Sequence, residues 1–171
     1  MLLLTVVSIS KKTGFILGVI GLIIVGVIVF AVTRPSSESV SNDGNSETPT
    51  YKTVLPNGKT VSDLGGWQRV SPPEAEPVFA YTDTVGGILV NVSQQPLPDS
   101  FASDISGEVA KLAKSYNAST QVDANSTKVY IGTSAKGPQS VIFTKDSLLI
   151  LIKSREKIDD ESWITYVTSL N

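Results

Sequence analysis

The hydrophobic positions of the chain form two patterns, one continuous and near the N-terminus, the other interrupted and beyond residue 50. Residues 14–32 read GFILGVIGLIIVGVIVFAV, with no charge, no proline and no hydrogen-bonding side chain. At about 1.5 Å rise per residue, this stretch covers the roughly 30 Å hydrocarbon core of a bilayer. It therefore predicts a transmembrane helix over residues 14–33, in contact with membrane lipid. The alternative is a signal peptide cleaved after Ala31, although signal peptides have a shorter apolar region of about 7–15 residues.

The charges that flank the apolar stretch predict its orientation. Lys11 and Lys12 precede it, whereas only Arg34 follows it closely. Lys and Arg are enriched on the cytoplasmic side of membrane helices, and acidic residues count little. Residues 1–13 are therefore predicted to be cytoplasmic. The rest of this single-pass chain would then lie outside the cell membrane, with the apolar stretch as a signal-anchor.

A polar segment separates the predicted anchor from the remainder. From Pro35 to Thr50 the chain reads PSSESVSNDGNSETPT, in which Val40 is the one apolar residue. Such a composition cannot bury enough apolar surface to offset the entropy of ordering the chain. We expect residues 34–50 to be a flexible linker, and residues 51–171 to form an exported domain long enough for one core.

Within the exported domain, hydrophobic residues recur with the period of strands. Ile88, Val90 and Val92 alternate with other positions, which is typical of a half-buried antiparallel strand. Residues 148–152 are apolar at every position, which predicts a central strand covered on both faces. Asn57-Gly58 lies between two short runs and predicts a hairpin over 54–61, limited by Pro56 to an edge or a loop. With these two included, strands are expected over 67–70, 78–83, 88–93, 128–133, 139–144 and 147–153.

Two segments show helical periodicity instead. The first has an apolar stripe at spacings of three and four, starts after Asp99 or Ser100 and ends at Asn117. The second begins after Asp159, with Ile158 positioned to pack on Trp163. Its apolar stripe comprises Trp163, Tyr166, Val167 and Leu170. The apolar stripe of the first segment comprises Phe101, Ile105, Val109, Leu112 and Tyr116. The pattern predicts an α+β fold: an antiparallel sheet of about five or six strands, packed by two amphipathic helices and preceded by one transmembrane helix.

Composition narrows the chemistry. The chain has no Cys and no His, so thiol nucleophiles, disulfides and sites built on those metal ligands are excluded. With a pI near 5.1 and three arginines, the sequence shows no cluster of basic residues that would bind the phosphates of nucleic acid. No Gly-rich phosphate loop follows a strand. The sequence assigns no catalytic residue, no cofactor-binding residue and no cofactor.

Two acidic sets are candidate binding sites. Glu74, Glu76 and Asp83 flank a proline-rich loop and would suit a Ca²⁺ ion if they met. Residues 159–161 are acidic because the N-terminus of a helix favours negative charge. Solvated or capping roles explain both sets without a ligand, so no metal site is assigned. Lys114 and Ser115 are adjacent on a helix and point apart, so they form no catalytic pair.

Several motifs occur in a fixed order in the exported domain, and with this order the chain resembles a known group. It resembles uncharacterised single-pass membrane-anchored proteins of small-genome candidate-phylum bacteria. The end of the chain, with its paired strands and capped helix, is similar to small exported α+β domains of unknown function. Neither resemblance implies an activity; the first implies a bacterial envelope location. The motifs are Val54-Leu55-Pro56-x-Gly58-Lys59, Leu64-Gly65-Gly66-Trp67, Val70-Ser71-Pro72-Pro73, Pro77-Val78-Phe79-Ala80-Tyr81 and Val92-Ser93-Gln94-Gln95-Pro96-Leu97-Pro98.

The residues before the anchor also resemble another family. Lys11-Lys12-Thr13-Gly14-Phe15, followed by an apolar run, is similar to the leader of type IV pilin-like proteins, which are cleaved after the glycine. Those proteins place a glutamate at the fifth mature position, where this chain has Val19. Pro35 and the polar segment also end the helix early. A pilin-like subunit processed after Gly14 is therefore an alternative.

The sequence thus predicts a membrane-anchored envelope protein. Its exported domain is expected to be a non-enzymatic binding or structural module with an envelope or protein partner. A surface hydrolase using carboxylates or an oxygen-ligand metal site is a second alternative.

Protease added to intact cells is expected to remove residues 51–171, because the basic flank places the domain outside the cell. Immunoblotting with an antibody to the domain measures the loss, and a cytoplasmic protein serves as the control. Full protection of the domain would reverse the predicted orientation. Intact mass of the membrane-extracted chain distinguishes the pilin-like alternative, for which the mature chain begins at Phe15.

Overall fold

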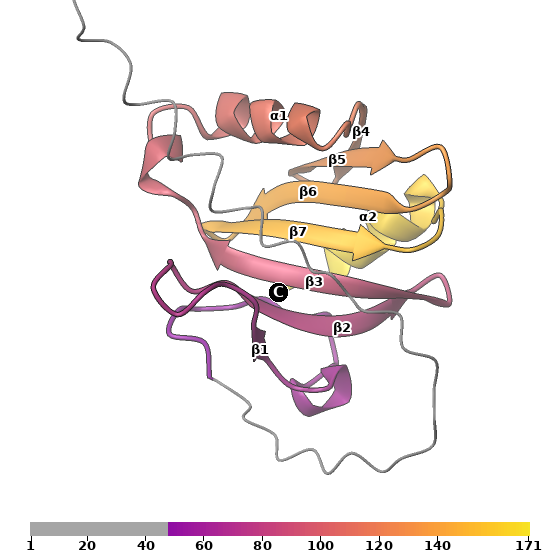
Figure 1. The fold of residues 1–171 in the computed structure, drawn as a ribbon. Coiled ribbons are helices and arrows are strands. Elements are labelled where there is room, and N and C mark those ends of the chain that lie inside the picture. The colour runs from indigo at the N-terminus through magenta and orange to yellow at the C-terminus, as the bar shows by residue number, and fades with distance from the viewer. Residues whose placement is uncertain (1–47) are drawn as a thin grey trace, which may run out of the picture. The chain divides into compact units, whose positions relative to one another are not determined.

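The computed structural model describes residues 48–171, in which a seven-stranded sheet carries two α-helices (Figure 1). Every neighbouring pair of strands is antiparallel, in the order β1-β2-β3-β7-β6-β5-β4. The elements are η1 (Ser62–Leu64), β1 (Gln68–Arg69), β2 (Phe79–Val85), β3 (Ile88–Pro96), η2 (Asp99–Phe101), α1 (Ile105–Ser115), β4 (Thr120–Ala124), β5 (Thr127–Thr133), β6 (Gln139–Lys145), β7 (Leu148–Ser154) and α2 (Asp160–Ser169).

Strand β7 is the middle strand of the seven. It pairs with β3 on one side, where Val92 lies opposite Ile152, and with β6 on the other. Leu149 and Ile150 point to opposite faces and are both buried. The predicted central strand is thereby confirmed, and its two-sided burial requires a layer on each face of the sheet.

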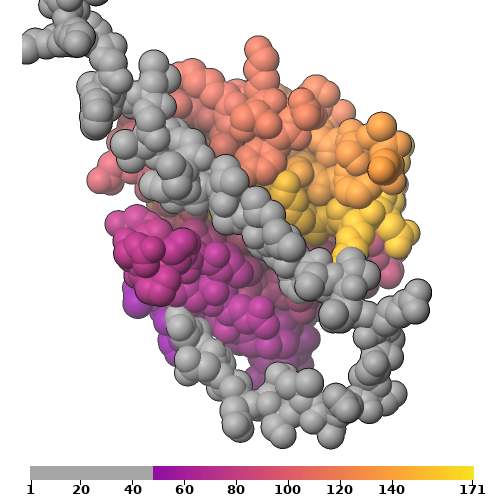
Figure 2. All heavy atoms as spheres, viewed as in Figure 1, coloured from indigo at the N-terminus to yellow at the C-terminus, as the bar shows by residue number. Residues whose placement is uncertain are grey.

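The two helices supply these layers on opposite faces. Trp163 and Val167 of α2 belong to the larger core, with Val92 and Ile152 of the sheet. Val109 and Ala113 of α1 pack in a smaller core on the other face, with Ile142 and Leu149. In Figure 1, α2 lies behind the sheet. Figure 2 shows the atoms of α1 forming the upper part of the surface seen from this side.

Two buried glutamines on the α2 side join the layers through hydrogen bonds. The Gln94 side chain pairs with Val54 as a strand would: it accepts from the Val54 N–H (3.0 Å) and donates to the Val54 carbonyl (2.7 Å). The Gln139 Oε1 accepts from Ile158 N–H (2.8 Å) and Trp163 Nε1 (3.0 Å). These bonds satisfy amides that would be costly to bury unpaired, and they fix residue 54 and the start of α2 on the sheet.

Residues 54–61 do not form the predicted hairpin. Asn57-Gly58 does form a turn, but the preceding residues pair with the C-terminus of the chain. Leu55 and Asn171 exchange hydrogen bonds of 2.9 and 3.0 Å, and the Asn57 N–H donates to the Ser169 carbonyl (2.8 Å). Pro56 has no N–H for a ladder, and its carbonyl accepts a single turn hydrogen bond from the Lys59 N–H (3.0 Å).

The sheet also has more strands than the five or six predicted. The added strand is β4, an edge strand whose exposed Thr120, Gln121 and Asp123 conceal the pattern of a strand. The first helix starts later than predicted: Asp104, rather than Asp99 or Ser100, caps it by accepting from Gly107 N–H (2.9 Å). Residues 99–101 form the separate turn η2. The Asp159 cap of α2 is confirmed, with Ser162 N–H at 2.8 Å.

The predicted membrane-related segments 1–13 and 14–33 lie outside the described residues, as does most of the linker 34–50. Within residues 48–171, no helix is long and apolar enough to cross a membrane.

Gly132 of β5 is expected to tolerate no side chain, because the loop after α1 packs directly on it. A Cβ there would lie 2.8 Å from the Tyr116 carbonyl oxygen and 2.9 Å from Cα and N of Ala118. Such overpacking typically costs about 1–3 kcal/mol. Chemical denaturation should show Gly132→Ala destabilised by about this amount, and Lys128→Ala, an exposed residue of the same strand, close to wild type. A Gly132→Ala chain as stable as wild type would contradict the close packing.

Candidate functional site

A polar groove of about 750 Å³ runs along α2, between the turn at residues 56–59 and the β2–β3 turn. We call it the α2 groove. Its walls are mainly hydroxyl, amide and charged side chains, in contrast to the apolar core beneath. The lining residues are Pro56, Asn57, Lys59, Thr84, Val85, Gly86, Asp159, Glu161, Ser162, Thr165, Tyr166 and Ser169.

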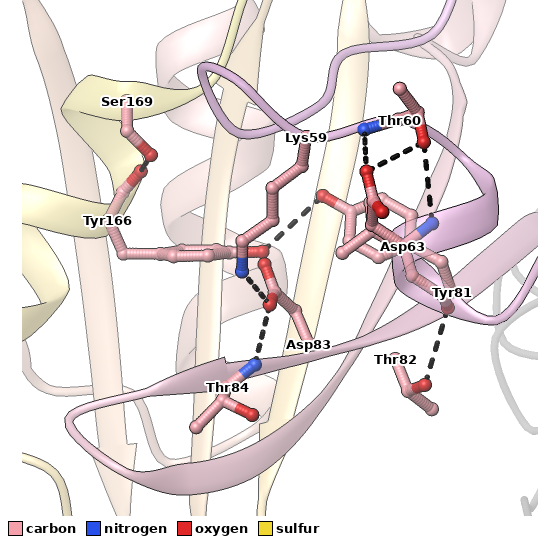
Figure 3. A network of polar contacts seen from close by, with 10 residues as sticks. Lys59, Thr60, Asp63, Tyr81, Thr82, Asp83, Thr84, Tyr166 and Ser169 are labelled. Atoms are coloured by element: carbon pink, nitrogen blue, oxygen red, sulfur yellow. Dashed lines mark hydrogen bonds and ion pairs between the residues drawn. The ribbon is translucent and has the colours of Figure 1, made fainter.

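A buried carboxylate, Asp83, lies behind the groove beside three lining residues, Lys59, Thr84 and Tyr166 (Figure 3). Asp83 is 6% exposed. Its Oδ1 accepts from the Thr84 N–H at 2.7 Å and forms an ion pair with the Lys59 ammonium. Its Oδ2 is buried beside the Tyr166 hydroxyl, which can donate to it. The ion pair and the tyrosine hydroxyls therefore form one polar cluster that is closed toward the core.

The alternation of β2 explains why an acidic residue is buried here. Phe79, Tyr81, Asp83 and Val85 occupy successive positions on one face, and that face meets α2. Asp83 therefore occupies a core position, and its charge must be neutralised locally because an unpaired buried charge is costly. Lys59 supplies the opposite charge.

The loop that carries Lys59 is held by a turn around Asp63. The Asp63 carboxylate accepts from both the N–H (2.8 Å) and the hydroxyl (2.7 Å) of Thr60. These two hydrogen bonds hold the pKa of Asp63 below its ordinary value. The Lys59 side chain itself remains 40% exposed. Its backbone is anchored, while its ammonium group sits at the boundary between the groove and Asp83.

Two tyrosines close the cluster on the core side. The hydroxyls of Tyr81 and Tyr166 are 3.4 Å apart, and both side chains are buried. Burial raises the pKa of Tyr81 to about 12. Burial also raises the pKa of Tyr166, and the neighbouring Tyr81 and Asp83 add to the effect. Both hydroxyls are therefore neutral at physiological pH, and they offer hydrogen bonds rather than charge.

The charges along the groove favour cations over anions. Asp159 and Glu161 contribute negative charge, and Asp83 adds another behind the wall. Lys59 is the one basic residue among those that line the groove, and it is engaged by Asp83. The Ser162 hydroxyl donates to Asp159 (2.8 Å), so it is paired with a weak base rather than an activating one. This set of groups suits binding through hydrogen bonds and charge.

The structure does not gather the predicted acidic set into a metal site. Glu74 and Glu76 are exposed in the loop between β1 and β2, whereas Asp83 is buried against Lys59. Within residues 48–171, no group of three or more acidic side chains could hold a metal ion. The solvated alternative is therefore wrong for Asp83, whereas the capping role of Asp159 is correct.

A serine–lysine pair occurs on the opposite face of the sheet, at positions other than Lys114 and Ser115. Lys153 Nζ donates to the Ser140 Oγ at 2.6 Å and lies 4.3 Å from the centre of the Tyr116 ring. Burial lowers the pKa of Lys153. Ser140 lies between β5 and β7, so its backbone is used in the sheet, and the nearby N–H groups of residues 116–118 bond to carbonyls of α1. Within residues 48–171, these nearby N–H groups are therefore not free to stabilise an oxyanion at the pair.

The sequence holds one signal for Asp83 and none for its partner. Reading β2 with a period of two places Asp83 on the apolar face with Tyr81 and Val85, which marks it as buried. Lys59 is 24 residues away on an irregular turn, and no local pattern links the two. Tyr166 is predicted as core, which it is, but it also lines the groove.

Comparison of the chain with protein-family models, with curated proteins and with solved structures found no match.

Stability is expected to fall as the pH rises above about 10, because the folded state holds protons on the two tyrosines that the unfolded state releases. Tyr81 has an ordinary value of 10.0 when unfolded and a pKa of about 12 when folded. The stabilisation is thus complete below pH 10 and is lost as the pH approaches 12. For Tyr81 alone, the shift corresponds to on the order of 3 kcal/mol.

Denaturant unfolding at pH 8 to 12 measures this effect. The double variant Tyr81→Phe, Tyr166→Phe should lose most of the alkaline fall in stability. The control, Tyr130→Phe on the opposite face, should keep it. An unchanged pH dependence in the double variant would show that other groups set the alkaline limit.

Proposed function

We propose that this protein is a single-pass membrane-anchored envelope protein whose exported domain is a non-enzymatic binding module, with the α2 groove as its binding site. The uncharged stretch at 14–32, the basic residues before it and the polar segment after it support the anchored arrangement. The anchor would hold the domain at the membrane surface, where it meets envelope components.

One observation carries the binding role, namely the groove of about 750 Å³ along α2, lined mainly by hydroxyl, amide and charged side chains. Polar groups that converge on a concave surface are typical of ligand-binding sites. Asp159 and Glu161 give this groove negative charge, which attracts a cationic or hydrogen-bonding ligand and repels an anion.

The two alternatives rest on different features. Processing as a pilin-like subunit depends on residues 11–15 and would leave the groove in the exported domain. A hydrolase using Glu74, Glu76 and Asp83 is disfavoured because these residues form no joint site. The Ser140–Lys153 pair would need oxyanion donors, and the nearby N–H groups of residues 116–118 are already bonded to carbonyls of α1.

Site-specific photocrosslinking tests the binding role for a ligand of any chemical class. The full chain, expressed in its own membrane, would carry p-benzoylphenylalanine in place of Thr165, which is exposed and lines the groove. We expect light-dependent adducts at this position, detected by mass shift. The control places the same group at Lys114, exposed on α1 across the sheet. Absence of adducts at Thr165, or equal adducts at both positions, would refute the groove as the binding site.

A further inference from the structure

The outer edge of β4 is exposed and is built differently from the protected edges of most sheets. Within residues 48–171, β4 lies at the end of the sheet and pairs with β5 alone. Three of its five residues are exposed. It contains no proline and no lysine, and it pairs one to one with β5, without a bulge. Proteins protect sheet edges with such features or with very short strands. The opposite edge is β1, which has two residues.

The turn after β4 determines which backbone groups face outward. A two-residue turn, 125–126, joins β4 to β5 directly after Ala124. In such a hairpin the residues that flank the turn exchange both backbone hydrogen bonds, and bonded and non-bonded pairs then alternate along the strands. Val122 therefore bonds to β5. The N–H and carbonyl groups of Gln121 and Asp123 point away from the sheet, toward the space where a further strand would lie.

We propose that the β4 edge binds the β4 edge of a second copy of this chain, in antiparallel register about Val122, and so forms a symmetric dimer. In this register Gln121 lies opposite Asp123 of the second copy, and these outward-facing residues exchange backbone hydrogen bonds. Val122 lies opposite its own equivalent on the two-fold axis. All five residues of β4 are then paired on both sides.

The side chains of β4 favour this register over the two neighbouring ones. The Gln121 amide can donate to the Asp123 carboxylate of the second copy, and the symmetry repeats this contact. Registers centred on Gln121 or on Asp123 would also match outward-facing groups, but they pair fewer residues of the strand. The register centred on Asp123 also places two carboxylates opposite each other, which is destabilising.

The two faces of the sheet are also compatible with the pairing. On the α2 face, Val122 is partly buried against the larger core and lies opposite the buried Val129 of β5. In the dimer the two Val122 side chains meet, so the apolar surface that each leaves uncovered is removed from water. On the other face, Asp123 lies opposite Lys128, so the acidic charge at the edge is balanced within each copy.

Disulfide crosslinking of the full chain in its own membrane tests the register, because the chain has no native cysteine. Val122→Cys places two thiols on the axis. The Cα atoms of a non-bonded antiparallel pair lie about 4.5 Å apart, which permits a disulfide. Copper phenanthroline should therefore convert this variant to a dimer on a non-reducing gel. Thr120→Cys, exposed on the same strand, is the matched control. Its two copies would be offset by about 13 Å along the strands, and it should stay monomeric.

Each crosslinking result supports or overturns the proposal. Dimers of Val122→Cys without dimers of Thr120→Cys support it. Equal crosslinking of the two variants indicates random collision and overturns it, as does the absence of Val122→Cys dimers. Stronger crosslinking of Gln121→Cys or Asp123→Cys than of Val122→Cys overturns the proposed register.

Charge variants of Gln121 test the same contact without touching the core. Gln121→Asp places like charges opposite each other and should weaken the dimer, whereas Gln121→Lys places opposite charges there and should strengthen it. We expect each to change the dimer Kd by about two- to thirtyfold, because two such pairs form per dimer. Analytical ultracentrifugation of the full chain in non-ionic detergent measures the Kd. Gln68→Asp, exposed on the opposite edge strand, is the control and should have no effect.

The charge variants decide the question if Val122→Cys does not fold. A monomeric wild-type chain, or a change in the same direction for Gln121→Asp and Gln121→Lys, overturns the dimer. The inference is independent of the proposed function, because no residue of β4 lines the α2 groove. Crosslinks at Thr165 to a ligand would therefore persist whether or not the β4 edges pair.

Discussion

The two-sided burial of β7 is the constraint on which the rest of the fold depends. A strand with apolar residues at both alternating sets of positions must be covered above and below, and it must lie inside the sheet. The strands therefore add outward from β7, with β3 and β6 as its immediate neighbours. The two helices are assigned to different faces for the same reason. Helix α2 covers the larger core, to which β2 also contributes. The groove along α2 therefore reaches the end of β2, next to Asp83.

Polar groups on the α2 face position the covering layer. Gln94 and Gln139 both lie in the sheet with side chains turned into the core, and each bonds to backbone in a covering segment. Apolar packing is tolerant of small shifts, whereas an amide that must satisfy both donor and acceptor is not. These glutamines therefore set the register of residue 54 and of α2 relative to the sheet. The positions of the walls of the α2 groove depend on that register.

The local patterns of the fold were predictable from the sequence, and the polar contacts between distant segments were not. The central strand, the alternation in β3 and the Asp159 cap follow from local patterns, because periodicity and capping act within a few residues. Strand β4 was not predicted because this edge strand has only one fully buried residue, Ala124, and so shows no apolar alternation. The Lys59–Asp83 pair was not predicted because its members are brought together by the tertiary contacts that place β2 and the 56–59 turn. No pattern in a single sequence encodes a meeting of that kind.

The pairing of residues 55–57 with the last residues of the chain has a mechanical consequence. A pull applied from the N-terminal side reaches the domain first at Tyr51 and Val54, and then at the hydrogen bonds between Leu55 and Asn171. The next residues along this path, Asn57 and Lys59, form a wall of the α2 groove. Tension on the chain would therefore draw Lys59 away from Asp83 and change the shape of the α2 groove.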